Sequence, residues 1–193
     1  MKKMNLVFIA IAAFSLLMAA DMVVNKNDGT EVVIPIEEIE NITFATAVWN
    51  ETMVEGITFQ WMTDADYLYG MVTAPTTGWV SVGFDPTNQM ADANILIGYV
   101  ESNGTVNMRD DFGTTAFSHA SDTSLGGTDN IMEQGGEETG GSTMLSFKIP
   151  LNSGDQYDRV LVPGNTYTII LAYGSSDNYT GIHSEATSTD IDL

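Results

Sequence analysis

Met90 and His183 are the two side chains of this sequence best suited to bind a transition metal together. The chain contains no cysteine and only two histidines, so neither a thiolate site nor a structural zinc site is expected. Both residues lie in polar stretches between apolar segments. A thioether and an imidazole are a known pair of axial ligands for haem iron. From spacing alone, however, core packing of the methionine and an ordinary surface role of the histidine are the commoner roles of such residues.

The element that must position Met90 runs over residues 78–100. Apolar side chains alternate with small or polar ones over residues 79–84, which predicts a half-buried strand. Residues 85–88, Asp-Pro-Thr-Asn, have the chemistry of a turn. Residues 94–100 form a nearly continuous apolar run that is short enough to be the next strand. The methionine is therefore expected in the connection between two strands.

The rest of the chain also consists of short strand-like segments separated by Gly and Pro turns. Further strands are predicted at residues 57–61, 67–74, 105–109, 143–151, 167–174 and 189–193. Residues 110–141 are predicted to be a long irregular loop, of the kind that is usually functional or mobile. No helical period of useful length is present after residue 20. This pattern predicts an all-β fold, an antiparallel β-sandwich of two sheets.

The N-terminal residues 1–20 have the pattern of a secretory signal peptide: two lysines, an apolar stretch and a small-residue end. Cleavage near Ala20 would leave a secreted or periplasmic protein without a membrane span, and an uncleaved anchor is the alternative. Residues 21–49 are predicted to be a hairpin segment with an Asp-Gly turn, followed by a linker. This segment resembles one that precedes the main domain in many secreted Bacteroidetes-type proteins. The main domain is expected over residues 50–193.

The charge balance is strongly acidic, with 26 Asp and Glu against 6 Lys and Arg and a formal net charge of −20. Such a surface repels nucleic acids and anionic membranes. Solubility is the simplest interpretation, and steering of a cationic partner protein is the functional one. Six aspartates could hold Ca²⁺ in loops, but they lack EF-hand spacing and are expected to be solvated. They are Asp85, Asp92, Asp110, Asp111, Asp122 and Asp129.

The stretch Gly78–Phe84, followed by Met90–Asn94, resembles the signature of the DOMON domain. The resemblance continues in order through residues 129–174, His183-Ser184 and the last three residues, so it covers about residues 50–193. It implies an immunoglobulin-like β-sandwich that binds either haem b or sugars. In the cytochrome members, the iron ligands are a methionine after the Gly-Trp strand and a histidine near the C-terminus. Met90 and His183 occupy those two places.

On this resemblance we expect a b-type cytochrome that carries out one-electron transfer with an unidentified redox partner protein, and not an enzyme. A haem would also need apolar walls, for which five residues are plausible: Trp61, Met71, Trp79, Phe84 and Tyr173. The alternative is a non-catalytic carbohydrate-binding module with aromatic side chains stacked on sugar rings. A hydrolase with paired carboxylates ranks third, because the sequence does not give their separation.

Three further residues carry expectations of their own. His119 is interpreted as an exposed loop histidine, with a ligand role as the alternative. Arg109 and Lys148 could pair with haem propionates, since arginine in particular suits carboxylate binding, or they could form ordinary surface pairs.

Overall fold

The structure is a computed structural model that describes residues 21–25, 29–35 and 48–193. The predicted signal peptide and the segment 36–47 lie outside the described residues. The chain divides into two compact units, Met1–Thr46 and Ala47–Leu193. Within the described residues, no helix has the length and hydropathy that a membrane-spanning segment requires.

The smaller unit contains an antiparallel pair of strands, β1 (Asp21–Asn25) and β2 (Glu31–Pro35). Val23 pairs with Val33 at the centre of the pair, and both side chains are exposed. Gly29 adopts a φ of 83°, a left-handed conformation that glycine tolerates in tight turns. The predicted hairpin is therefore confirmed in its pairing, whereas residues 26–28 of its turn lie outside the described residues.

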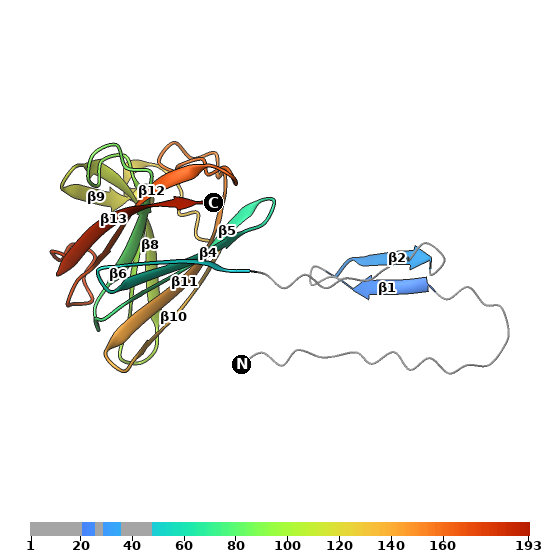
Figure 1. Cartoon of the computed structure of the whole chain (residues 1–193), viewed down its shortest axis with the longest axis horizontal. Coiled ribbons are helices and arrows are strands. Elements are labelled where there is room, and N and C mark those ends of the chain that lie inside the picture. Colours follow the sequence, from blue (N-terminus) through green and yellow to red (C-terminus); the bar gives the residue numbers. More distant parts are fainter. Residues whose placement is uncertain (1–20, 26–28, 36–47) are drawn as a thin grey trace. The chain divides into compact units, whose positions relative to one another are not determined.

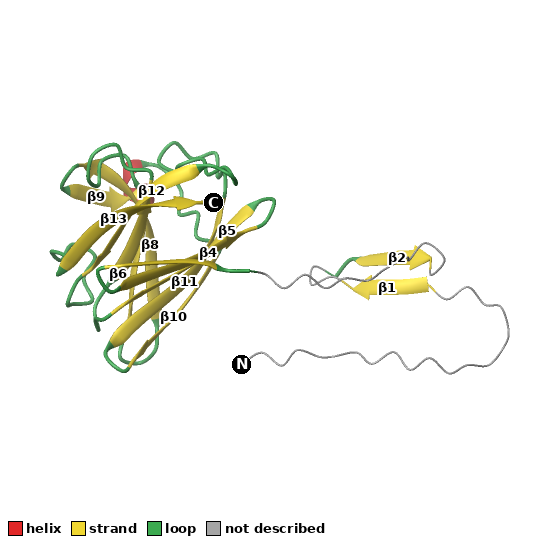
Figure 2. Cartoon of the chain, viewed as in Figure 1, coloured by secondary structure: helices red, strands yellow, loops and turns green. Residues whose placement is uncertain are grey.

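The larger unit is an antiparallel β-sandwich, as predicted (Figure 1 and Figure 2). One sheet has the strand order β10-β11-β5-β4-β3, and the other has the order β13-β12-β6-β7-β8-β9. The five-stranded sheet consists of β3 (Asn50–Val54), β4 (Ile57–Thr63), β5 (Tyr67–Ala74), β10 (Glu133–Thr139) and β11 (Ser142–Pro150). The six-stranded sheet consists of β6 (Val80–Phe84), β7 (Asn94–Val100), β8 (Val106–Thr115), β9 (Ser118–Ser121), β12 (Thr166–Tyr173) and β13 (Glu185–Asp192).

The main core lies between the two sheets and is built by alternation along the strands. In β4 and β5 every second side chain is buried, as the period-two sequence pattern requires. Phe59 is at the centre, with its ring centroid 5.4 Å from that of Trp61 and 6.0 Å from that of Phe84. Gly70 makes room for the ring of Phe147, because a Cβ at Gly70 would lie 2.2 Å from that ring. Of these contacts, that between Phe59 and Phe84 joins the two sheets across the core.

Strand β6 of the six-stranded sheet is buried on both faces, which differs from the predicted half-buried strand. All five residues of β6 are buried. Val80, Val82 and Phe84 belong to the main core, whereas Trp79 belongs to a second apolar cluster on the outer face. That second cluster also contains Ala93, Ile95 and Ile97, with Met90, Tyr99, Ile170, Ala172 and Tyr179 packed against it.

Residues 110–141 are mostly regular, so the prediction of a long irregular loop is wrong. Strand β8 continues to Thr115, β9 follows, and the short helix α1 (Asp122–Leu125) and β10 complete the stretch. The charged pair Asp110-Asp111 and the Gly-rich sequence of β10 have low strand propensity. Pairing of β8 with β7 and of β10 with β11 overrides that propensity.

Candidate functional site

A cavity of about 780 Å³ lies against the outer face of the six-stranded sheet. Its floor is formed by outward-facing residues of β6, β7 and β12. The register places the floor residues in two rows, Ala172–Ser81–Ile97 and Ile170–Gly83–Ile95. Gly83 lets the neighbouring isoleucines close over the strand, because a Cβ there would lie 2.7 Å from Ile170 Cγ1. The floor is therefore apolar, apart from the hydroxyl of Ser81.

Met90 reaches the cavity from the loop of residues 85–92, which connects β6 and β7. Three non-glycine residues of this loop have left-handed backbone conformations: Asp85 at φ 52°, Gln89 at φ 52° and Asp92 at φ 63°. Such conformations persist only where the surrounding structure holds them, and they concentrate at functional sites. The methionine lies between two of these residues, so its backbone position is tightly specified.

Contacts with β8 hold this loop in place. The backbone N–H of Asp92 donates to the carbonyl oxygen of Gly113 at 2.7 Å, and the N–H of Gly113 donates to the carbonyl oxygen of Ala93 at 2.9 Å. A Cβ at Gly113 would lie 1.6 Å from the carbonyl oxygen of Met90, so only glycine allows this approach. The side chain of Met90 then packs against the outer cluster.

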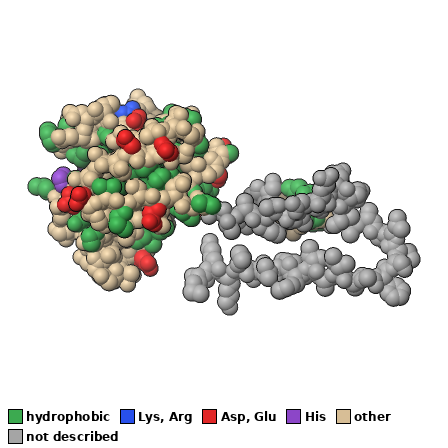
Figure 3. Space-filling view, in the orientation of Figure 1, with side chains coloured by type: hydrophobic (Ala, Val, Ile, Leu, Met, Phe, Trp, Pro, Cys, Tyr) green, Lys and Arg blue, Asp and Glu red, His purple; other side chains and the backbone are tan. Residues whose placement is uncertain are grey.

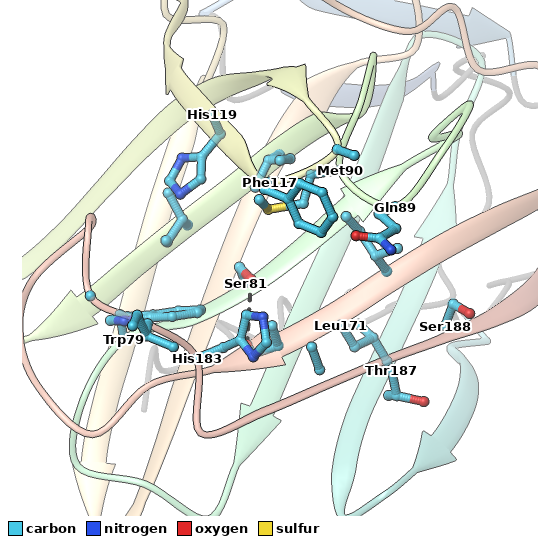
Figure 4. A pocket seen from close by; sticks show the side chains of 18 of the residues that line it. Trp79, Ser81, Gln89, Met90, Phe117, His119, Leu171, His183, Thr187 and Ser188 are labelled. Atoms are coloured by element: carbon cyan, nitrogen blue, oxygen red, sulfur yellow. Dashed lines mark hydrogen bonds between the residues drawn. The ribbon is translucent and has the colours of Figure 1, made fainter.

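His183 reaches the cavity from the loop of residues 174–184, between β12 and β13. The carboxamide oxygen of Asn178 accepts from the N–H of Thr180 at 3.1 Å, and the N–H of Ser184 donates to the carbonyl oxygen of Tyr173 at 2.7 Å. His183 is exposed at the mouth of the cavity. Figure 4 shows Met90 and His183 on opposite sides of the cavity, so the structure brings these two predicted residues together.

His119 also lines the cavity, and the interpretation as an exposed loop residue is wrong. It lies in β9 with a side chain that is 17% exposed, and its Nδ1 is 2.5 Å from Oδ2 of the buried Asp111. This leaves Nε2 as the ring nitrogen available to the cavity (Figure 4). A carboxylate that fixes one imidazole nitrogen is a common support for an imidazole that binds a ligand with the other.

Asp111 is a junction between His119 and Arg109. Arg109 donates to it through Nε at 2.5 Å and through Nη2 at 2.6 Å. Burial favours a higher pKa for Asp111, but the hydrogen bonds from His119 and Arg109 outweigh it and hold the pKa below its ordinary value. The Arg109 guanidinium also lies 4.4 Å from the ring centroid of Tyr179, and burial, with a smaller contribution from Tyr99, raises the pKa of Tyr179 to about 12. Arg109 is thus held in a buried network beside the cavity.

Trp79 forms part of the cavity wall and is only 4% exposed. Its indole Nε1–H has no hydrogen-bond partner among the described residues. Gly174 packs against the indole, since a Cβ there would lie 2.2 Å from Nε1. A buried indole N–H normally finds an acceptor. This one is enclosed by Gly174 and Gly181, so Trp79 contributes its apolar ring to the cavity wall.

The other predicted wall residues lie elsewhere. Phe84 and Trp61 belong to the main core, and Tyr173 packs against that core. Met71 is in β5 of the five-stranded sheet. Lys148 lies in the neighbouring strand β11. Its Nζ is 3.2 Å from Oε1 of Glu133 and lies over the ring of Tyr67, so Lys148 forms a surface ion pair remote from the cavity.

Several residues of the site were not identified from the sequence. The apolar floor is formed by Ile95, Ile97 and Ile170. The sequence signal for these residues is an apolar side chain at the outward-facing positions of β7 and β12, which alternate with the core-facing positions. Phe117, in the turn between β8 and β9, lines the mouth and is 81% exposed. An aromatic side chain in a polar turn is a weak signal, but it is visible in the sequence.

The surroundings of the site are sparsely basic. On the face drawn in Figure 3, acidic side chains are spread over the surface, whereas basic ones are confined to a single patch. The cavity itself presents one thioether and two imidazoles above an apolar floor. Its volume is within the range of about 300–1,000 Å³ that small-molecule sites occupy. The arrangement suits a large apolar ligand that carries a metal ion or stacks against aromatic side chains.

Comparison with known proteins gives one family match. The sequence model of the DOMON domain matches residues 54–174. No curated protein matches the sequence.

Two solved structures resemble the chain at low sequence identity. The cytochrome domain of cellobiose dehydrogenase from Myriococcum thermophilum aligns with 92% of this chain and 90% of its own, at 9% identity and a TM-score of 0.48. A carbohydrate binding module of family 9 from Caldicellulosiruptor kristjanssonii, in complex with glucose, aligns with 75% of this chain and 73% of its own, at 11% identity and a TM-score of 0.34.

Proposed function

Because this chain belongs to the DOMON domain family, we propose that its cavity binds one haem b, with Met90 and His183 as the axial ligands of the iron. The observation that carries the proposal is that these two residues, far apart in the sequence, line the same cavity from two different loops. A thioether and an imidazole form a ligand pair that haem iron accepts and that raises its reduction potential. His119 is the alternative nitrogen ligand, because it lines the same cavity.

The residues present fit a haem in three respects. The floor of Ile95, Ile97 and Ile170 suits an apolar macrocycle. The ring of Trp79 adds an aromatic wall to the cavity. The thioether and imidazole match the preference of iron for such ligands.

When bound, the haem would supply one-electron redox chemistry. The protein's own contribution would be to fix the ligands and to exclude water. The loop that carries Met90 is held by backbone hydrogen bonds to β8, so the thioether is positioned before any ligand arrives. Since both axial positions would be filled by side chains, we propose electron transfer to a partner protein rather than catalysis. With a net charge of −20, this chain would suit a cationic partner in the secreted or periplasmic space.

The test is the visible absorption spectrum of the purified chain after addition of haem, first oxidised and then reduced with dithionite. We expect a sharp Soret band and resolved α and β bands on reduction, which indicate a six-coordinate low-spin iron. Met90→Ala should lose the low-spin ferrous spectrum. His183→Ala should do the same, and His119→Ala should retain it if the axial nitrogen comes from His183.

Met71→Ala is the matched control, because this methionine lies in the five-stranded sheet away from the cavity. It should bind haem with the spectrum of the unmodified chain. Low-spin spectra that survive in both Met90→Ala and His183→Ala would overturn the ligand assignment. If His119→Ala loses the low-spin spectrum and His183→Ala retains it, the nitrogen ligand is His119 of β9 instead of His183.

Sugar binding is the second candidate, and the exposed ring of Phe117 at the cavity mouth is the observation in its favour. Trp61 and Trp79, by contrast, are too buried to offer a stacking face. A colourless protein that does not retain haem but binds a polysaccharide, and loses that binding in Phe117→Ala, would establish this reading.

A further inference from the structure

A second cluster of chemically active side chains lies on the core side of β8, away from the cavity. Asp110 in β8, Asp122 at the start of α1 and Asp158 in the connection between β11 and β12 each direct a carboxylate oxygen to one place. The three oxygens lie within 4.8 Å of one another. Asp110 lies two residues after Met108 in β8, so the two side chains are on the same face of the strand. Met108 packs against the main core. This site is independent of the proposed haem site.

Burial sets this cluster apart from an ordinary acidic surface. Asp110 is 1% exposed and Asp122 is fully buried. Neither carboxylate oxygen of Asp122 has a hydrogen-bond partner among the described residues, and the same holds for Oδ1 of Asp110 and Oδ1 of Asp158. In the part of the chain that the structure describes, Oδ2 of Asp110 is the one oxygen of the three carboxylates that accepts a main-chain hydrogen bond, from the N–H of Asn130 at 2.9 Å. Buried carboxylate oxygens without donors are costly unless a cation or a proton compensates them.

The electrostatic environment is uniformly negative. Burial, with the charge of Asp158 as the next cause, raises the pKa of Asp110 to about 8 and that of Asp122 to about 7. Burial also raises the pKa of Asp158. A hydrogen bond with the Ser153 side chain opposes this rise, and the charges of Asp155 and Asp129 add to it. The charged groups that act most strongly on the three carboxylates are thus other carboxylates.

We propose that Asp110, Asp122 and Asp158 form a binding site for a hard divalent cation, Ca²⁺. All the converging atoms are oxygens, and three carboxylates are a donor set that suits Ca²⁺. Thiolate and imidazole groups, which softer metals prefer, are not among the converging side chains of the described residues. The ligands come from separate segments, and Ca²⁺ accepts such irregular arrangements more readily than Mg²⁺ does.

Asn130 organises the approach to this site. When the side-chain amide of Asn130 is oriented with its nitrogen toward Thr128 and Asp158, it donates to the carbonyl oxygen of Thr128 and to Oδ2 of Asp158, both at 3.1 Å. The main-chain N–H of the same residue binds Asp110. One residue therefore orients two of the three carboxylates and leaves their Oδ1 atoms for the cation.

The cation would join segments that lie far apart in the chain. It would tie β8 to α1 and to the connection of residues 151–165. The chain has no cysteine, so no disulfide can do this. Because α1 directly follows β9, which carries His119, the site also anchors one rim of the cavity.

The experiment uses the purified full chain without haem, treated with EDTA, dialysed and titrated with CaCl₂ or MgCl₂. We expect saturable Ca²⁺ binding by calorimetry, a rise of several degrees in the unfolding temperature and a weaker effect of Mg²⁺. Asp122→Asn should weaken Ca²⁺ binding by at least about tenfold. Asp66→Asn, in an exposed turn, is the matched control and should behave like the unmodified chain.

Stability in EDTA separates a cation site from a merely structural aspartate. Asn removes a buried charge at nearly constant volume, so Asp122→Asn in EDTA should be at least as stable as the unmodified chain in EDTA. It should also show no rise in unfolding temperature with Ca²⁺. An unmodified chain whose unfolding temperature does not respond to Ca²⁺, or an Asp122→Asn chain that responds as strongly, would overturn the proposal. Either result leaves the haem assignment untouched.

Discussion

Gly113→Ala should displace the loop that carries Met90, although Gly113 is not one of the residues that line the cavity. The added Cβ would lie 1.6 Å from the carbonyl oxygen of Met90, whereas real Cβ atoms essentially never approach closer than 3.0 Å. The two backbones must therefore separate by at least 1.4 Å, the difference between those values. The obstructing atom is backbone, so no side-chain rotation relieves the contact.

The expected cost follows from the bonds that this separation strains. Two backbone hydrogen bonds join Gly113 to Asp92 and Ala93, and each contributes about 0.5–1.5 kcal/mol. Overpacking adds about 1–3 kcal/mol. Gly113→Ala should thus lower the free energy of unfolding by about 2–6 kcal/mol. Urea denaturation of the haem-free chain measures this loss, and the visible spectrum should show weakened methionine ligation.

Gly135→Ala is the matched control, because its Cβ would meet only the hydroxyl of Ser146, the end of a small movable side chain. It should change the free energy of unfolding by less than about 1 kcal/mol. If Gly113→Ala stays within about 0.5 kcal/mol of the unmodified chain and binds haem with an unchanged spectrum, the claim that β8 positions Met90 is refuted.

Phe117→Ser should leave the free energy of unfolding within about 0.5 kcal/mol, because the ring is 81% exposed, but it should speed transfer of haem to apomyoglobin severalfold by uncovering the cavity mouth. An unchanged transfer rate would show that the ring does not cover the ligand. The turn at Asp64 should respond to acid. Hydrogen bonds, first of all from the N–H of Asp66, hold the pKa of the Asp64 carboxyl group below the ordinary 3.8. The stabilisation that this group provides is therefore present above pH 3.8 and is lost as the pH falls through the lowered pKa. Asp64→Asn should accordingly lose less stability than the unmodified chain between about pH 5 and pH 2 in thermal unfolding, and parallel pH profiles would contradict this account.

The sequence predicted the sandwich because its strands obey period-two patterning around clear turns. It also predicted the loop of Met90, since Asp-Pro-Thr-Asn separates two apolar runs. The same patterning could have placed Phe84 correctly. It shares the parity of Val80 and Val82, which face the main core, and not that of Trp79, which faces the cavity.

Strand β8 shows why the rest could not be predicted. Asp110 and Asp111 have the composition of a solvated loop, yet Asp111 is buried because Arg109 and His119 compensate its charge. His119 is only eight residues away, but its partner becomes apparent only once β9 folds back on β8. The convergence of Asp158 with Asp110 likewise depends on tertiary structure, which local patterns do not encode.

The two apolar clusters on opposite faces of the six-stranded sheet separate the stability of the domain from its ligand binding. The core between the sheets is complete in itself, because Phe59, Val80 and Val82 are fully buried and do not line the cavity. The outer face can therefore change its occupant through its two rim loops, residues 85–92 and 174–184, while the interior stays as it is. Substitutions in those loops can therefore change which ligand the domain binds, during evolution or by protein engineering. The residues that stabilise the fold need not change with them.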